Sequence, residues 1–381
     1  MNYTKTYEEM LSDDRKKLFI DIRESEEFEK NSPPEAVNIP REEFRERIDE
    51  LPKDEPIYLI CYSGKYSDEL CEVLSPKGYE IYSIKSGIYS YYKYTIEHQL
   101  SDEEEQEKRC REIERSIIKK YRRDLWSQFT KAINTYELIK DGDKIAVCIS
   151  GGKDSMLMAK LFQELLKHGK KYFDVVYLVM NPGYNDINYT TILNNAKLMQ
   201  IPITVFDSDI FDIVADESGS PCYLCARMRR GALYSKAKEL GCNKIALGHH
   251  YDDVIETILM GMLYGGQFQT MMPKLHSTNF EGMELIRPLY LIREESIKKW
   301  REYNNLTFIN CACRLTESCA SCGGTEKGSK RAEIKELIAE LRERSPFIEA
   351  NIFKSVENVH LNAIVAYKTA DGEKHHFLDR Y

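Results

Sequence analysis

The stretch KIAVCISGGKDS, at Lys144–Ser155, decides the fold of the larger part of this chain. Its apolar first half predicts a short buried strand, and apolar residues recur at helical spacing directly after it. The polar turn between them holds Gly151 and Gly152, which let the backbone approach a ligand closely. The free N–H groups at the start of the helix, together with Lys153, favour an anion. The sequence therefore predicts an anion-binding turn; the alternative is a plain polar turn with two glycines.

This turn differs from the two commonest phosphate loops, because it has neither the GxxxxGK(S/T) nor the GxGxxG spacing. It resembles instead the pyrophosphate loop of the ATP-pyrophosphatase (PP-loop) family. That family cleaves ATP between the α- and β-phosphates and adenylates an oxygen of its substrate. The resemblance implies catalytic roles for Lys153 and Asp154. It also implies that the whole turn binds ATP, through Ser150, Gly151, Gly152, Lys153, Asp154 and Ser155.

Length and composition set limits on the chain. Its 381 residues predict two or three domains, and 42% hydrophobic residues are enough for real cores. The net charge of −8 is not a basic signature, so a nucleic-acid partner has to be met by local patches. No apolar run reaches the roughly 18 residues of a membrane helix, and no signal peptide is expected. The 11 cysteines include CxxC clusters, which indicate metal or redox work in a reducing compartment and predict a cytoplasmic protein.

Residues 1–100 are predicted to form a separate small α/β domain. Strands expected at 18–22, 56–60 and 81–84 alternate with helices, which favours a parallel sheet. Cys61 opens a loop, CYSGKYS, between a strand and a helix. Backbone N–H groups in such a loop point at the sulfur and stabilise a thiolate or a persulfide. The alternative is a buried structural cysteine at the end of a strand.

This first region resembles the rhodanese-like domain. The resemblance is carried by Asp21–Arg23 after the first strand, Ala36–Pro40, Cys61, and Ser86-Gly87 after the last strand. It implies that Cys61 is catalytic and carries sulfur as a persulfide. One position departs from the family pattern, because Tyr66 stands where the usual loop has arginine.

An acidic stretch and a basic helix connect the two domains over 101–140. Apolar residues at i, i+3, i+4 spacing predict one long amphipathic helix from Cys110 to Leu138. Its polar face is either a plain solvent-exposed face or a contact for a phosphate backbone. On the second interpretation the contact is made by Lys119, Lys120, Arg122 and Arg123.

Residues 141–381 are predicted to form a doubly wound parallel sheet with a C-terminal helical extension. Strands expected at 175–179, 203–206 and 244–247 follow the first strand and alternate with helices. Ligands of such folds bind at the carboxyl ends of the strands, where GHHYDD follows the last strand. A histidine there can be a core residue. The complete string favours contacts with a nucleotide and its Mg²⁺, through Gly248, His249, Asp252 and Asp253.

The CxxC at Cys222 and Cys225 has four interpretations: zinc, an iron–sulfur cluster, a redox disulfide, or chance. Three arginines after it would hold phosphates near a metal: Arg227, Arg229 and Arg230. A third ligand has to come from elsewhere, and NCACRLTESCASCGG offers four cysteines that could also form a zinc site of their own. These are Cys311, Cys313, Cys319 and Cys322.

Residues 108–359 resemble the tRNA 2-thiocytidine synthetase family. The matches are the basic helix, SGGKDS, CYLCARMRRGALY, KIALGHHYDDVIETILMGMLYGG, MMPKL, IRPLYLIRE and the tail helix. The resemblance implies a [4Fe–4S] cluster held by three cysteines, and sulfur insertion at C2 of an adenylated cytidine in the tRNA anticodon loop. Cys222 and Cys225 would be two ligands. Alignment from downstream favours Cys322 as the third, whereas alignment from upstream favours Cys311 or Cys313.

Together these features predict an ATP-dependent tRNA sulfurtransferase in which a persulfide on Cys61 feeds sulfur to the cluster. A cysteine desulfurase or another persulfide donor would load Cys61, and a homodimer is left open. One alternative is a PP-loop thiolase of a tRNA uridine or of a small molecule. The other is a non-catalytic sulfur-relay or redox protein, against which the intact SGGKDS and GHHxDD strings count.

Overall fold

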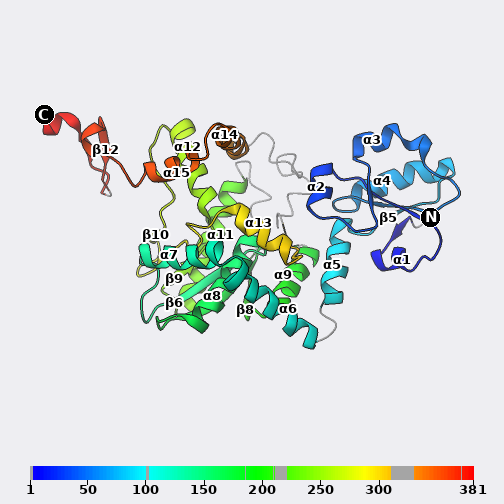
Figure 1. Ribbon diagram of the computed structural model, residues 1–381, viewed down its shortest axis with the longest axis horizontal. Helices are drawn as coiled ribbons and strands as arrows, with labels where there is room; N and C mark the ends of the chain where they lie inside the picture. Colours follow the sequence, from blue (N-terminus) through cyan, green and yellow to red (C-terminus); the bar gives the residue numbers. More distant parts are fainter. Residues whose placement is uncertain are drawn as a thin grey trace.

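The chain forms an N-terminal α/β domain, a larger α/β domain and a C-terminal arm that projects from the larger domain (Figure 1). The computed structural model describes residues 3–99, 103–184, 186–208, 210, 221–309, 330–369 and 371–381. No helix within these ranges is both long and apolar enough to span a bilayer.

The N-terminal domain is built on a five-stranded parallel sheet with the strand order β1-β5-β4-β2-β3. Side chains of its central strand alternate between two buried clusters, with Leu59 on one face and Tyr58 and Ile60 on the other. The predicted parallel sheet is therefore confirmed. The strands are β1 (Thr4–Lys5), β2 (Leu18–Asp21), β3 (Val37–Asn38), β4 (Ile57–Ile60) and β5 (Ile81–Ile84). The helices are α1 (Tyr7–Leu11), α2 (Ser25–Lys30), α3 (Arg41–Glu46), α4 (Lys65–Leu74) and α5 (Ile88–Gln99).

The connecting segment is not the single helix that its spacing predicts. It consists of α6 (Glu103–Arg115), two π-helical segments and α7 (Ser127–Thr135). The π-helical segments are η3 (Ser116–Lys120) and η4 (Arg122–Trp126). The buried Ser116 hydroxyl accepts hydrogen bonds from Trp300 Nε1 at 3.1 Å and Asn304 Nδ2 at 3.0 Å. These tertiary contacts offset the poorer geometry of π turns, which are rare and concentrate at functional sites.

The larger domain is built on a six-stranded sheet with the order β10-β11-β9-β6-β7-β8, in which only the edge strand β10 is antiparallel. The predicted doubly wound parallel sheet is confirmed, with β10 and β11 as additions. The strands are β6 (Lys144–Ile149), β7 (Asp174–Asn181), β8 (Ile203–Asp207), β9 (Lys244–Ala246), β10 (Lys274–His276) and β11 (Glu284–Ile286). The helices are α8 (Lys153–His168), α9 (Asp186–Leu198), α11 (Pro221–Glu239), α12 (Tyr251–Gly265) and α13 (Glu294–Tyr303).

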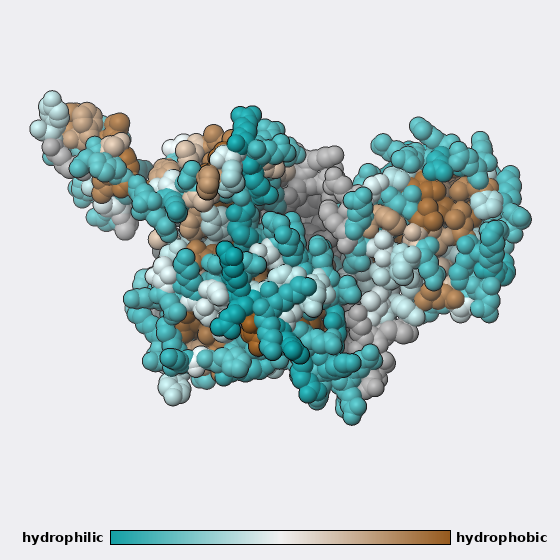
Figure 2. Space-filling view, viewed as in Figure 1, coloured by the Kyte–Doolittle hydropathy of each residue, from teal (hydrophilic) through white to brown (hydrophobic). Residues whose placement is uncertain are grey.

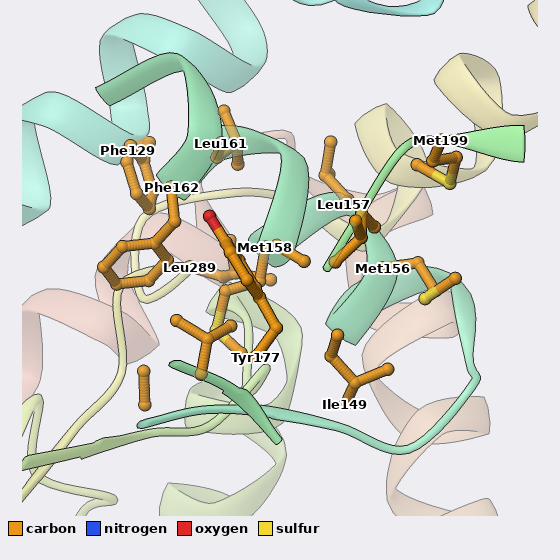
Figure 3. Packing of buried hydrophobic residues seen from close by; sticks show 14 of the residues in the cluster. Phe129, Ile149, Met156, Leu157, Met158, Leu161, Phe162, Tyr177, Met199 and Leu289 are labelled. Atoms are coloured by element: carbon orange, nitrogen blue, oxygen red, sulfur yellow. The ribbon is translucent and has the colours of Figure 1, made fainter. Parts of the chain in front are cut away.

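The core of the larger domain fixes α8 against the sheet and against α7 (Figure 3). Leu157, Leu161 and Phe162 of α8 are fully buried, and the Phe162 ring lies 5.5 Å from that of Phe129 in an edge-to-face contact. Burying three such side chains stabilises the fold by roughly 1.5–3 kcal/mol each. The start of α8 is therefore held rigidly at the end of β6.

Two helices, α14 (Lys330–Arg344) and α15 (Ile348–Ser355), pack on α12 and precede the C-terminal arm. The arm is a short hairpin of β12 (Ala366–Lys368) and β13 (Lys374–His376). Figure 2 shows hydrophobic atoms on the arm, where Val365 and Leu378 are exposed, and a further hydrophobic patch on the N-terminal domain.

Candidate functional site

The turn between β6 and α8 is preformed for an anion. Gly151 has a φ of +84°, and a Cβ on it would lie 2.5 Å from the Ile192 side chain, so only glycine fits. The Ser155 hydroxyl accepts from Ser150 N at 3.1 Å and donates to Gly152 O at 3.0 Å. Because Gly152 occupies the cap of α8, no cap side chain covers the first N–H groups of the helix.

The structure brings the GHHYDD string against this turn. A Cβ on Gly248 would lie 3.2 Å from Ser155 N, so the end of β9 and the start of α8 are in close contact. His250 Nε2 lies 4.0 Å from Asp154 Oδ1. That oxygen of Asp154 is buried and has no hydrogen-bond partner among the described residues. An unpartnered carboxylate oxygen beside a phosphate turn fits a divalent cation.

Glu294, which was not expected from the sequence, pairs with the lysine of the turn. Lys153 Nζ lies 2.9 Å from Glu294 Oε1 and 3.2 Å from Asp154 Oδ2. Burial opposes ionisation of Glu294, but Lys153 and then Lys298 outweigh it and lower its pKa to about 2. Burial likewise opposes the charge on Lys153, yet Asp154 and Glu294 raise its pKa. Glu294 is part of the IRPLYLIRE match, but nothing in its spacing indicates the pair.

The carboxylates of the two aspartates of GHHYDD accept hydrogen bonds from backbone N–H groups at the starts of two helices. Asp252 Oδ2 accepts from Glu294 N at 2.7 Å, and Asp252 Oδ1 lies 3.1 Å from Arg293 Nη2. Asp253 Oδ2 accepts from His250 N at 3.0 Å, and His250 Nδ1 accepts from Asp253 N at 3.4 Å, which forms a capping box for α12. The Asp252 bonds join the starts of α12 and α13, and the capping box fixes the start of α12.

Cations surround the other histidine. Burial, followed by Arg287, Arg331 and Arg230, lowers the pKa of His249 to about 4, so the imidazole is neutral at pH 7. Its Nδ1 is buried with no hydrogen-bond partner among the described residues. Burial and the neighbouring Arg230 also lower the pKa of Arg287 to about 10. Of these cations only Arg230 was expected from the sequence, and their convergence favours an anionic ligand.

A buried carboxyl lies next to this cluster. Glu256 Oε2 is 2.9 Å from Arg331 Nε at the start of α14. Burial, together with the nearby carboxylates of Asp253 and Glu294, raises the pKa of Glu256 to about 7, although Arg331 opposes the shift. A carboxyl that titrates near neutrality at a candidate site is suited to proton transfer.

The candidate metal ligands are only partly within the described residues. Cys222 and Cys225 lie three residues apart in the first turns of α11, and positions three apart share one face of a helix. The other candidate ligands lie outside the described residues: Cys311, Cys313, Cys319 and Cys322. In the described ranges no group of three His, Cys, Asp or Glu side chains could hold a metal ion.

The Cys61 loop of the N-terminal domain is held by short-range hydrogen bonds. Cys61 is 6% exposed, and its Sγ accepts from Gly64 N at 3.2 Å and lies 3.2 Å from Ser67 Oγ. Ser67 Oγ also donates to Gly64 O at 2.9 Å. A Cβ on Gly87 would lie 2.3 Å from Cys61 O, so the turn after β5 packs directly on the loop. The loop therefore directs one backbone N–H group at the sulfur.

Tyr66, which replaces the loop arginine of the rhodanese-like pattern, is itself in contact with two arginines. The Arg41 guanidinium lies 3.7 Å above the Tyr66 ring, and Arg45 Nε donates to Tyr66 Oη at 3.1 Å. Both arginines belong to α3, so the positive charge missing from the loop is supplied next to it by another element.

The four basic residues of the connecting segment are exposed on the two π-helical segments: Lys119, Lys120, Arg122 and Arg123. Lys120 Nζ lies 3.6 Å above the Tyr303 ring. Within the described part of the chain none of the four forms an ion pair with a carboxylate, in contrast to Lys299, which pairs with Glu295 at 2.6 Å. Cations beside an aromatic ring suit a nucleic-acid backbone.

Comparison with known proteins gives similarities for both domains. The model of the PP-loop domain family matches residues 121–314, and that of the rhodanese-like domain matches residues 4–94. The tRNA-cytidine(32) 2-sulfurtransferase of Paraburkholderia xenovorans is 34% identical over 244 residues, which are 63% of this chain and 70% of that protein. The protein of the same name from Coxiella burnetii is 36% identical over 235 residues, or 60% of this chain and 87% of its own length.

Among solved structures, the U34-tRNA thiolase NcsA from Methanococcus maripaludis with its [4Fe–4S] cluster matches with a TM-score of 0.48 and 22% identity. The match covers 61% of this chain and 79% of that chain.

Proposed function

We propose, because this chain belongs to the PP-loop family of tRNA-cytidine(32) 2-sulfurtransferases, that it replaces the C2 oxygen of an anticodon-loop cytidine in tRNA by sulfur in an ATP-dependent reaction. The observation that carries the proposal is the contact between the Ser150–Ser155 turn and the Gly248–Asp253 string. It assembles an anion site, a lysine and an unpartnered carboxylate oxygen at the carboxyl ends of parallel strands, where nucleotides bind in this fold class.

Adenylation solves the leaving-group problem. The C2 oxygen attacks the α-phosphorus of ATP and pyrophosphate leaves. Hydrosulfide-level sulfur then adds to C2, and the oxygen departs as part of AMP. The net reaction converts C2=O, ATP and HS⁻ into C2=S, AMP and protonated pyrophosphate, without a change in oxidation state. The α8 N–H groups and Lys153 would stabilise the charge that develops on the phosphates.

The residues of the site fit two further groups, a Mg²⁺ ion and an iron–sulfur cluster. The unpartnered Asp154 Oδ1 fits Mg²⁺, with Asp252 and Asp253 as the further candidates from the sequence. Bound Mg²⁺ would neutralise phosphate charge. The CxxC spacing of Cys222 and Cys225 in α11 fits a thiolate-bound cluster, with Cys322, or next Cys313, as third ligand. When bound, such a [4Fe–4S] cluster supplies an iron that can hold sulfur.

The proposal also assigns roles to the domains, to Cys61 and to the basic side chains. Residues 1–100 are the sulfur-carrier domain, 101–140 the connecting segment and 141–381 the thiolation domain. Cys61 receives sulfur as a persulfide from a cysteine desulfurase or another persulfide donor in the cytoplasm. The tRNA backbone binds Lys119, Lys120, Arg122 and Arg123 as well as Arg227, Arg229 and Arg230. A homodimer is compatible with these roles.

The decisive experiment incubates the anaerobically purified protein with unmodified tRNA, ATP, Mg²⁺ and sulfide, and digests the tRNA for nucleoside mass spectrometry. We expect 2-thiocytidine, formed with AMP and pyrophosphate, and none with Lys153→Ala. Formation of 2-thiouridine instead would show that the substrate base is uridine and not cytidine. The absence of any thiolated nucleoside from an iron-loaded preparation would refute the proposal.

A further inference from the structure

The two domains meet at the carboxyl edge of the N-terminal sheet, which is the side where its parallel strands end and where Cys61 lies. β2 and β4 are parallel neighbours, with Asp21 opposite Ile60, so both strands end at this edge and Cys61 follows β4 there. The helix after β2, α2, is followed by its C-cap residue Asn31, whose Nδ2 donates to Thr307 Oγ1 in the larger domain at 3.2 Å. The sulfur-carrying edge is thus the one that faces the PP-loop domain.

On the opposite side of this contact, Thr307 is tied to the core of the larger domain. Its carbonyl oxygen accepts from Asn195 Nδ2 of α9 at 2.8 Å, and Asn195 is 1% exposed. Two residues further on, Ile309 Cδ1 lies 2.7 Å from where a Cβ of Gly151 would be. Ile309 in turn precedes Cys311 by two residues in the sequence. The contact therefore abuts the Ser150–Ser155 turn, and in the sequence it lies just before the cysteine-rich stretch.

The Cys61 loop is connected rigidly to the same contact. Ile88 N, at the start of α5, donates to Cys61 O at 2.9 Å, and α5 then packs along α9, as Figure 1 shows. Arg23 Nη2 donates to Asn31 O at 2.7 Å and to the fully buried Asp21 at 2.6 Å. Buried charge-assisted bonds of this kind hold a fixed geometry.

We propose that this contact, formed by Asn31, Thr307, α5 and α9 and called here the docking edge, holds Cys61 in place so that each chain thiolates tRNA with its own persulfide. The inference rests on the proposed function and adds the route of the sulfur. The Cys61–S–SH group passes its outer sulfur to an acceptor thiolate. One S–S bond breaks as another forms, Cys61 leaves as a thiolate, and the exchange is redox-neutral. A dithiol reductant then supplies the two electrons that release sulfur as sulfide.

The first test disrupts the docking edge with Asn31→Arg, which places a bulky charge against Thr307 and leaves the Asn31 carbonyl in place. Glu29→Arg is the matched control, because Glu29 is an exposed residue of α2. With a persulfide donor, and with dithiothreitol kept low enough that no free sulfide accumulates, Asn31→Arg should thiolate tRNA about tenfold more slowly than the control, since a tethered but undocked domain retains only its effective concentration. With sulfide the two should be equal. Equal persulfide-driven rates would overturn the proposal.

The second test mixes full-length Cys61→Ala with full-length Lys153→Ala. Neither variant alone completes persulfide-driven thiolation, and within-chain delivery predicts that the mixture stays below about a tenth of the wild-type rate at micromolar protein. Recovery to half the wild-type rate would show delivery between chains and overturn the proposal.

Amide hydrogen exchange detects the docking edge independently of the thiolation activity. Asn31→Arg should raise exchange in α5, α9 and residues 304–309, whereas Glu29→Arg should not. Unchanged exchange would mean that the docking edge does not form in solution. Suppose that exchange differs between the wild type and Asn31→Arg while the wild type thiolates no tRNA even with sulfide. In that case the docking edge stands and the proposed function fails.

Discussion

Lys153 Nζ lies 2.9 Å from Glu294 Oε1, so the first residue of α8 is joined to the first residue of α13 across 141 positions of sequence. The pair is completed by Asp252, whose carboxylate accepts the Glu294 backbone N–H. Both side chains are largely buried, and each shifts the pKa of the other toward the charged form. Glu294 therefore acts as a positioning residue that keeps Lys153 charged and aimed at the turn.

The first prediction concerns this pair. Lys153→Ala should abolish tRNA-dependent release of AMP and pyrophosphate. Glu294→Gln keeps the shape and removes the charge, and the loss of one charged hydrogen bond, about 1.5–3 kcal/mol, should slow AMP release about 10- to 100-fold. Glu295→Gln is the control, because Glu295 pairs with Lys299 on the surface. Unchanged AMP release by Glu294→Gln would refute its positioning role.

The second prediction concerns pH and His249. Its pKa is lowered from 6.5 to about 4, so the folded state binds fewer protons than the unfolded state between these values. The contribution of His249 to stability should therefore be complete above pH 6.5 and be lost as the pH drops toward 4. His249→Gln should flatten this dependence, whereas the exposed His276→Gln should not.

Tryptophan fluorescence during urea unfolding measures this effect in the right domain. The chain has only 2 tryptophans, Trp126 and Trp300, and both belong to the larger domain and its connecting segment. The same slope in His249→Gln as in the wild type would contradict the assignment of the shift to His249. The comparison with the variant is needed because Glu256, whose pKa is raised to about 7, changes stability in the opposite direction over the same pH range.

The third prediction concerns tRNA affinity. Replacing Lys119, Lys120, Arg122 and Arg123 by alanine should weaken binding and reduce the slope of log affinity against log salt by about 3, at roughly 0.7–0.9 per phosphate contact. Arg111→Ala is the control, because Arg111 is already paired with Glu107 at 3.1 Å. An unchanged salt slope in the quadruple variant would show that these side chains do not touch the RNA backbone.

How much of this site is predictable from sequence depends on how local each feature is. The strand, the turn and α8 follow each other directly, so apolar runs and Gly151 predict them. The Lys153–Glu294 pair is non-local and has no periodic signal. The adjacent histidines are likewise indistinguishable in sequence, whereas the fold gives His250 the capping of α12 and leaves His249 buried among arginines.

The connecting segment shows the same limit in its backbone. Its apolar spacing correctly indicates helix but does not show the π turns. These turns occur where Ser116 accepts hydrogen bonds from Trp300 and Asn304, which are distant in the chain. Strands β10 and β11 were missed because each has only 3 residues, which is too short for an alternating pattern.

The fourth prediction concerns the metal. Cys222→Ala and Cys225→Ala should each lose the bound iron and the thiolation activity, and of the four downstream cysteines Cys322→Ala should match them. Cys148→Ala is the control, since Cys148 is buried in the core of the same domain. Metal analysis of anaerobic preparations provides the measurement. Zinc in place of iron, or iron retained in every downstream variant, would rule out a cluster that uses this segment.

The fifth prediction concerns Cys61. Serine at this position is nearly isosteric and keeps the hydrogen bonds from Gly64 N and to Ser67, so the loop should survive the change. The wild-type chain, loaded by a cysteine desulfurase, should gain about 32 Da per added sulfur in intact mass, which dithiothreitol removes, as expected of a persulfide. Cys61→Ser should not gain it, and Cys71→Ala, a change in the core of the same domain, should gain it normally.

In turnover, Cys61→Ser should lose thiolation driven by the desulfurase and keep thiolation driven by sulfide, because free sulfide bypasses the N-terminal domain. The ratio of the two rates, measured on one preparation, cancels differences in cluster content and folding. Equal loss with both sulfur sources would assign Cys61 a structural role, and full activity with both would mean that the N-terminal domain takes no part in this reaction.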